Sequence, residues 1–118
     1  MKKEPVVFLK HILDAIIAIE VYTKNLSKQE FMEYQHKVNQ DGVVRRLEVI
    51  GEAVRYLPEE FKQQHGEVAW NKALSMRNKL IHEYFGVDLD LVWDTVTKIL
   101  PPFKEQITKF LEEHTKQQ

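Results

Sequence analysis

The chain contains no cysteine, which excludes a disulfide framework and a thiolate-bound metal site and makes the reducing cytoplasm its expected location. Glycine and proline are scarce, with four of each in 118 residues. Long apolar runs are also missing. Lys10, His11, Asp14 and Glu20 interrupt the apolar stretch that follows Pro5, so neither a signal peptide nor a membrane span is expected. These absences leave a globular protein with few sharp turns and no membrane segment.

The charge balance shows no excess of either sign. Lysine and arginine total 17, aspartate and glutamate total 18, and the formal net charge is -1. Such a chain has no global field that attracts a polyanion, which argues against a dedicated nucleic-acid-binding protein. An enzyme that acts on RNA needs only a local cationic cleft, and its binding to bulk RNA would be weak and salt-sensitive. The composition is therefore compatible with an RNA-cleaving enzyme.

Apolar residues recur at intervals of three and four along most of the chain, and no segment shows sustained two-residue alternation. With the length, this pattern predicts a single all-α domain over residues 1–118, an up-and-down four-helix bundle with additional short helices. The expected helices are 5–24, a short one opened by Ser27, 41–57, a short one after Pro58, 67–85, one capped by Asp88, and a last one after Pro101-Pro102. The two prolines are expected to break or kink the helical path, and the polar tail 112–118 to fray.

One glycine falls inside an expected helix. Gly51 lies within the 41–57 segment, where a glycine costs about 1 kcal/mol relative to alanine. Its most reasonable use is to let the backbone of another helix come close. We therefore expect a tight helix contact at Gly51.

The most informative segment is 77–84, which reads Arg-Asn-Lys-Leu-Ile-His-Glu-Tyr. Arginine is a permanent forked cation that matches phosphate oxygens, and histidine exchanges a proton near neutral pH. Together they suit RNA cleavage without a metal. His82-Glu83 lacks the second histidine of a zinc-binding helix, and the other histidines are scattered, so we expect no metal and no cofactor.

The spacing of the motif leaves two arrangements open. Arg77 and His82 are separated by about 140° around an ideal helix, so they do not point the same way. Either the arginine side chain wraps toward the histidine, or two copies of the helix pair and form a two-fold composite site. Arg77 also lies on the apolar stripe of its helix, where it could simply pair with a carboxylate such as Glu52. A lone helical histidine is usually solvated or structural, and Tyr84 by itself fits a core aromatic.

The motif Arg-Asn-x3-His-x-Tyr resembles the signature of HEPN domains, and the surrounding residues resemble the HepT-like toxins of prokaryotic toxin–antitoxin pairs. All of the motif positions match. The similarity extends over most of the chain, through residues 46–53 with their Gly-Glu-Ala step, Trp70, 76–85, Val87-Asp88, 91–93 and 100–102.

The resemblance implies a helical ribonuclease that dimerises around the motif and is neutralised by an MNT-type nucleotidyltransferase antitoxin. By position, Arg77 and His82 would form the catalytic pair, and Asn78 would orient the phosphate of a tRNA or mRNA substrate. Independently of the resemblance, Glu52 is a possible supporting partner of Arg77. Tyr84 would be the residue that the antitoxin adenylylates, which would add bulk and negative charge at the cleft.

Two other interpretations remain. In the first, the chain is a non-catalytic helical partner, or the substrate-presenting subunit, of a nucleotidyltransferase, and its near-neutral charge favours this reading. In the second, it is a structural bundle with an incidental motif, which predicts a monomer with Arg77 buried in an ion pair and His82 facing bulk water. The complete set of motif residues favours the enzyme.

Overall fold

A computed structural model describes residues 4–82 and 86–116, and within these ranges it contains helices and no strand. This confirms the predicted all-α class. The elements are α1 (Pro5–Thr23), α2 (Lys28–Phe31), the 3₁₀ helix η1 (Tyr34–His36), α3 (Lys37–Tyr56), α4 (Glu59–Gln64), α5 (Trp70–His82), α6 (Leu89–Asp94), the π-helical η2 (Thr95–Ile99) and α7 (Leu100–Lys116).

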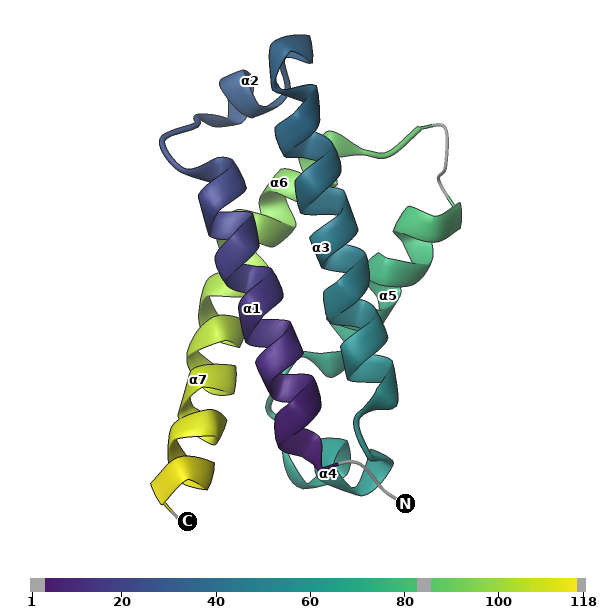
Figure 1. The fold of residues 1–118 in the computed structure, drawn as a ribbon. Helices are drawn as coiled ribbons and strands as arrows, with labels where there is room; N and C mark the ends of the chain where they lie inside the picture. The colour runs from purple at the N-terminus through teal and green to yellow at the C-terminus, as the bar shows by residue number, and fades with distance from the viewer. Residues whose placement is uncertain (1–3, 83–85, 117–118) are drawn as a thin grey trace.

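The long helices form an up-and-down bundle (Figure 1). Helix α1 rises, α3 descends beside it, α5 rises on the far side of α3, and the continuous path of α6, η2 and α7 descends again. The main contacts join α1 to α3, α3 to α5 and α1 to α7. The short α2 lies at one end of the bundle and α4 at the other, near both termini (Figure 1). Helix α3 is therefore the central element, with α1 and α5 on its two sides.

The core is built from the apolar stripes of these helices. Each of the long helices buries one face, as the intervals of three and four predicted. Phe31 of α2 closes one end of the core and packs against Trp93 of α6, with ring centroids 5.2 Å apart. The side chains that are almost completely buried are Phe31, Ile12, Ile16, Ile19, Ile50, Ile107, Val43, Val54 and Val92.

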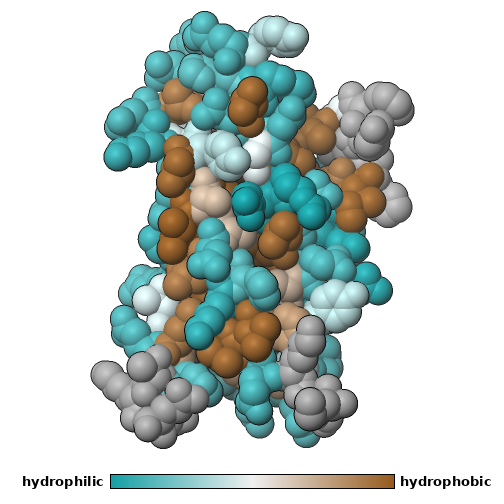
Figure 2. Space-filling view, in the orientation of Figure 1, coloured by the Kyte–Doolittle hydropathy of each residue, from teal (hydrophilic) through white to brown (hydrophobic). Residues whose placement is uncertain are grey.

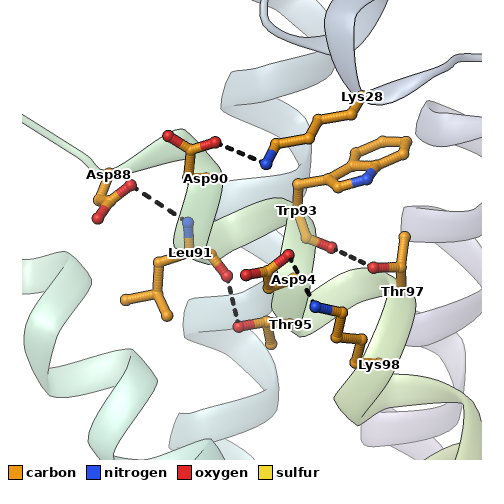
Figure 3. Close-up of polar contacts among 9 residues, drawn as sticks. All are labelled: Lys28, Asp88, Asp90, Leu91, Trp93, Asp94, Thr95, Thr97 and Lys98. Carbon is orange, nitrogen blue, oxygen red and sulfur yellow. Dashed lines mark hydrogen bonds and ion pairs between the residues drawn. The ribbon is translucent and has the colours of Figure 1, made fainter.

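Two of the predicted helix starts are confirmed by their caps. The Ser27 hydroxyl accepts a hydrogen bond from the Glu30 backbone N–H at 3.1 Å, and the Glu30 carboxylate accepts one from the Ser27 N–H at 2.9 Å. Hydrogen bonding from Ser27 lowers the pKa of the Glu30 carboxyl, with the Ser27 backbone N–H as the larger cause and the Ser27 side chain as the smaller. Asp88 caps α6 by accepting from the Leu91 N–H at 3.2 Å (Figure 3).

Other helix boundaries differ from the sequence-based expectation. Helix α3 begins at Lys37, before the expected start at Asp41, and η1 leads directly into it. The first turn of α3 has no apolar periodicity, so the sequence pattern did not reveal this earlier start. The buried Gln40 side chain in that turn donates to the carbonyls of Phe31 and Glu33, at 2.8 and 3.0 Å. Helix α5 begins at Trp70, after the expected start at residue 67. Burial and tertiary hydrogen bonds, which a periodicity search does not detect, decide these ends.

The sequence predicted that Pro101 and Pro102 break or kink the helical path, and the break is wrong. Helix α7 begins at Leu100, so both prolines occupy its first turn, where the fixed φ of proline is compatible with helical geometry. The wider π turn of η2 precedes them, and the Leu100 N–H donates to the Thr95 carbonyl within it. The path therefore changes its hydrogen-bond pattern before the prolines and continues.

Side-chain hydroxyls bond to carbonyls beside this π turn. The Thr95 and Thr97 hydroxyls each donate, at 2.8 Å, to the carbonyl four residues earlier (Figure 3). Helix α7 extends through Lys116 and so includes the described part of the tail 112–118, whose fraying stays a prediction. Within the described ranges, no helix is both long and apolar enough to cross a membrane.

Candidate active site

The site begins with the close contact of α3 and α5 at Gly51. Gly51 is buried, and a Cβ atom built on it would collide with the Cβ of Arg77 and come within 3.0 Å of the Ala73 carbonyl oxygen. The expectation that Gly51 admits another helix backbone is therefore confirmed. Because the helices touch here, the base of the Arg77 side chain lies directly against α3.

The Arg77 guanidinium is fixed from two directions. Its Nη2 lies 2.7 Å from Oε2 of Glu52 on α3, and its Nη1 donates to Oδ1 of Asn78 at 3.0 Å. The structure thus contains the expected pairing of Arg77 with Glu52. The side chains of Arg77 and Glu52 remain 22% and 39% exposed, so the pair is accessible to solvent. A guanidinium has five N–H donors, and two contacts leave others for a further acceptor.

Arg77 and Glu52 open onto a groove of about 420 Å³ between α1, α3 and α5, a volume within the range of roughly 300–1,000 Å³ typical of ligand pockets. The groove is lined by Phe8, His11, Arg45, Glu48, Val49, Glu52, Ala53, Tyr56, Arg77 and Ile81. Figure 2 shows polar and apolar side chains interspersed over the face that α1 and α3 share. Two arginines and two glutamates line the groove, so a single copy presents nearly balanced charge there.

A second hollow continues along α3 toward the end of the motif helix. It also measures about 420 Å³, and Arg45 and Glu48 line both hollows. Lys37, Leu80 and Val87 are among its other lining residues. The Arg77 groove therefore leads along α3 toward the segment that follows α5.

The structure brings three of the five predicted site residues together: Glu52, Arg77 and Asn78. His82 is the last residue of α5, but its side chain lies outside the described part of the protein. Tyr84 lies entirely outside the described residues. The catalytic pairing of Arg77 with His82 and the modification of Tyr84 therefore stay predictions. Among the residues described, no cluster of three histidine, cysteine, aspartate or glutamate side chains could hold a metal ion.

Several groove residues were missed by reasoning from the sequence. Arg45, Glu48, Phe8 and Tyr56 line the groove, and none of them was a candidate site residue in the sequence analysis. A usable signal existed, because positions 45, 48, 52 and 56 repeat at helical intervals and hence share one face of α3. The contribution of α1 to the groove had no such signal.

Comparison with known proteins places the chain in a family. The match covers residues 12–110 and is to the family described as Ribonuclease HepT-like. The chain belongs to the Ribonuclease HepT-like family. Membership confirms the predicted family and its class of enzyme, a ribonuclease.

Curated relatives agree with this placement. The chain is 44% identical to "Gamma-glutamylcyclotransferase and putative RNase MJ0434" of Methanocaldococcus jannaschii over 96% of its own length, but it spans only 50% of that protein. It is 39% identical to "Probable ribonuclease HepT" of Thermococcus cleftensis, with 92% of this chain and 97% of the relative covered. "Putative RNase TTE0752" of Caldanaerobacter subterraneus is also 39% identical, with 93% and 96% covered. No solved structure matches the chain.

Proposed function

We propose that this member of the HepT-like family is a metal-independent endoribonuclease toxin that cleaves single-stranded or loop RNA, in a tRNA or an mRNA. The observation that carries the proposal is the position of Arg77. Its guanidinium is held by Glu52 and Asn78 at the wall of an open groove, with N–H donors left for a phosphate. An arginine needed only for folding would not require a groove in front of it.

In the proposed reaction, the ribose 2′-oxygen attacks the adjacent phosphorus and the bond from phosphorus to the 5′-oxygen breaks. The 2′-hydroxyl gives up its proton and the leaving 5′-oxygen gains one, so the products are a 2′,3′-cyclic phosphate and a 5′-hydroxyl. His82 performs one of these proton transfers, a contribution of about 10²–10⁴ in rate. Arg77 stabilises the charge that develops on the phosphoryl oxygens, and Asn78 orients the phosphate.

We further propose that the active form is a homodimer. One copy carries nearly balanced charge in its groove, which is a weak attraction for a polyanion. Pairing two motif helices around a two-fold axis would bring residues of both copies to one site. Ile81, which lies at the groove and is 44% exposed, provides apolar surface suited to such a contact.

We propose that an MNT-type nucleotidyltransferase antitoxin controls the toxin. In this scheme the antitoxin transfers AMP to Tyr84, and the attached nucleotide blocks RNA by its bulk and negative charge. The rival function is that of a non-catalytic partner or substrate-presenting subunit of the same nucleotidyltransferase. The nearly balanced charge of the groove favours this rival, because it attracts a polyanion only weakly.

The deciding experiment is cleavage of end-labelled tRNA and mRNA by the purified protein in EDTA, with the 3′ ends of the products mapped. Cyclic-phosphate ends that are lost in His82→Ala, in a protein that stays folded and dimeric, are the expected result. His36→Ala is the matched control, because His36 lies in η1 and lines neither hollow along α3. Absence of cleavage by an unmodified, well-folded dimer would assign the chain to the non-catalytic role.

A further inference from the structure

Tyr56, the last residue of α3, is an exposed aromatic at the Arg77 groove. Its side chain is 58% exposed, although it lines the same groove as Arg77 and Glu52. The Phe8 ring of α1 stacks on it, with centroids 6.2 Å apart and ring planes inclined by 19°. Phe8 therefore fixes the orientation of the tyrosine ring while more than half of the tyrosine surface stays open.

One arginine side chain lies against this ring, and two others line the same groove. The Cζ atom of Arg55 lies 5.9 Å from the Tyr56 ring centroid, within the range of a cation–π contact. Arg45 and Arg77 line the same groove. An oriented aromatic ring beside arginines is the arrangement by which proteins bind single-stranded nucleic acid, since bases stack on the ring and phosphates contact the cations.

We propose that Tyr56 is a stacking platform for a base of the RNA strand whose phosphate Arg77 binds. This rests on the proposed function and adds a substrate subsite to it. The platform requires an unpaired base, because bases within a duplex are stacked on each other and present no free face. Tyr56 would thus favour single-stranded or loop RNA and help to position the strand, without taking part in the proton transfers.

The family of the chain favours RNA over a second copy of the chain as the occupant. The chain belongs to a ribonuclease family, Arg55 lies beside the ring, and Arg77 lines the same groove with its side chain 22% exposed. Tyr34 serves as the comparison, because it is 88% exposed and lines no part of the Arg77 groove.

The test is binding of a short fluorescein-labelled single-stranded RNA that carries 2′-O-methyl groups and therefore cannot be cleaved by attack of a 2′-hydroxyl. The full chain is compared with Tyr56→Ala, Tyr56→Phe and Tyr34→Ala by fluorescence anisotropy. We expect Tyr56→Ala to weaken binding by about 5- to 100-fold, and Tyr56→Phe to bind like the wild type because it keeps the ring. Tyr34→Ala is expected to bind like the wild type.

An abasic version of the same oligonucleotide separates stacking from electrostatics. On this probe Tyr56→Ala and the wild type should bind equally, because no base is present to stack. Unchanged binding of Tyr56→Ala to the normal RNA would overturn the proposal, and so would an equal loss of binding on the abasic probe. A change in oligomeric state of Tyr56→Ala would also overturn it, by assigning the ring to a protein interface.

Cleavage assays on ordinary RNA keep this inference distinct from the proposed function. If the wild type binds RNA through Tyr56 but leaves it intact, the ribonuclease proposal fails and the platform stands. If the wild type cleaves RNA and Tyr56→Ala binds and cleaves as well as it does, the platform fails and the ribonuclease proposal stands.

Discussion

Two ion pairs of nearly equal length join different helices of this bundle and differ in their surroundings. The Arg77–Glu52 pair connects α5 to α3 at 2.7 Å, and the Lys28–Asp90 pair connects α2 to α6 at 2.8 Å (Figure 3). The side chains of the first pair are 22% and 39% exposed, and those of the second are 49% and 62% exposed. Length alone therefore does not distinguish them.

The difference lies in what surrounds each pair. Arg77 sits on a helix contact that only a glycine permits, and it faces a groove. Lys28 and Asp90 lie in water, where ion pairs contribute little to stability and are screened by salt. We infer that the first pair holds an arginine in place for chemistry, whereas the second is a surface contact. The following predictions test this distinction.

The largest effect is expected from removing the guanidinium. Arg77→Ala should lower kcat for RNA cleavage by about 10²–10³, because the charge that develops on the phosphoryl oxygens loses its partner. Arg77→Lys should rescue little, since a single ammonium does not reproduce a fork that contacts Glu52, Asn78 and a phosphate at once. The control is Arg46→Ala, at an exposed position that lines neither hollow along α3. Equal activity of the Arg77 and Arg46 variants would remove Arg77 from the site.

The next effect concerns the helix contact beneath the arginine. Gly51→Ala should reduce the free energy of unfolding by about 1–3 kcal/mol, because the new methyl group collides with the Arg77 side chain and pushes α5 away from α3. Urea denaturation measures this change. Gly66→Ala is the matched control, as the nearest atom to its new methyl group would be the Gln63 carbonyl oxygen at 3.8 Å. Similar costs at the two glycines would contradict the tight contact.

A smaller effect is expected from Glu52→Gln, which keeps the shape of the side chain and removes its charge. Glu52 is a positioning residue, so kcat should fall by about 10- to 100-fold as Arg77 loses its orientation. KM should not rise, because the groove loses a negative charge that repels RNA. Steady-state kinetics separate the two constants. A raised KM with unchanged kcat would show that Glu52 contacts the substrate and does not act through Arg77.

The smallest effect is expected at the surface pair. The hydrogen bond and charge of Asp90 raise the pKa of Lys28 above its usual 10.5, with smaller contributions from Asp94 and Asp88. The small stabilisation is therefore fully present below pH 10.5 and is lost as the pH rises through the raised pKa. A double-mutant cycle of Lys28→Ala and Asp90→Ala, measured by thermal unfolding, should show weak coupling that salt abolishes, with RNA cleavage unchanged. Loss of cleavage in either variant would extend the functional site to α6.

Much of the fold could be predicted from local patterns. Residues close together in the sequence predicted the Ser27–Glu30 capping box and the Asp88 cap. The cost of a glycine inside a helix predicted the close contact at Gly51. The continuity through Pro101-Pro102 could not be predicted in this way, because the π turn before the prolines depends on how Thr95 and its neighbours pack. Sequence patterns locate helices better than they locate helix ends.

The candidate site also contains residues that local patterns predicted and residues that they did not. Motif spacing identified Arg77 and Asn78, and Glu52 was named as a carboxylate with which Arg77 could pair. Phe8 and Tyr56 lie far apart in the sequence, and no periodicity links them. Their rings meet only because α1 and α3 pack side by side.

The sequence by itself determined the helical class, the apolar faces that form the core and the motif that identifies the family. These features depend on residues three or four positions apart, whose relation is set by the geometry of one helix. The tertiary structure alone decided that Glu52 meets Arg77, that a groove lies in front of this pair, and that an oriented tyrosine lies at the same groove. These features depend on the packing of α1, α3 and α5, and the contacts between helices are fixed only when the whole core assembles.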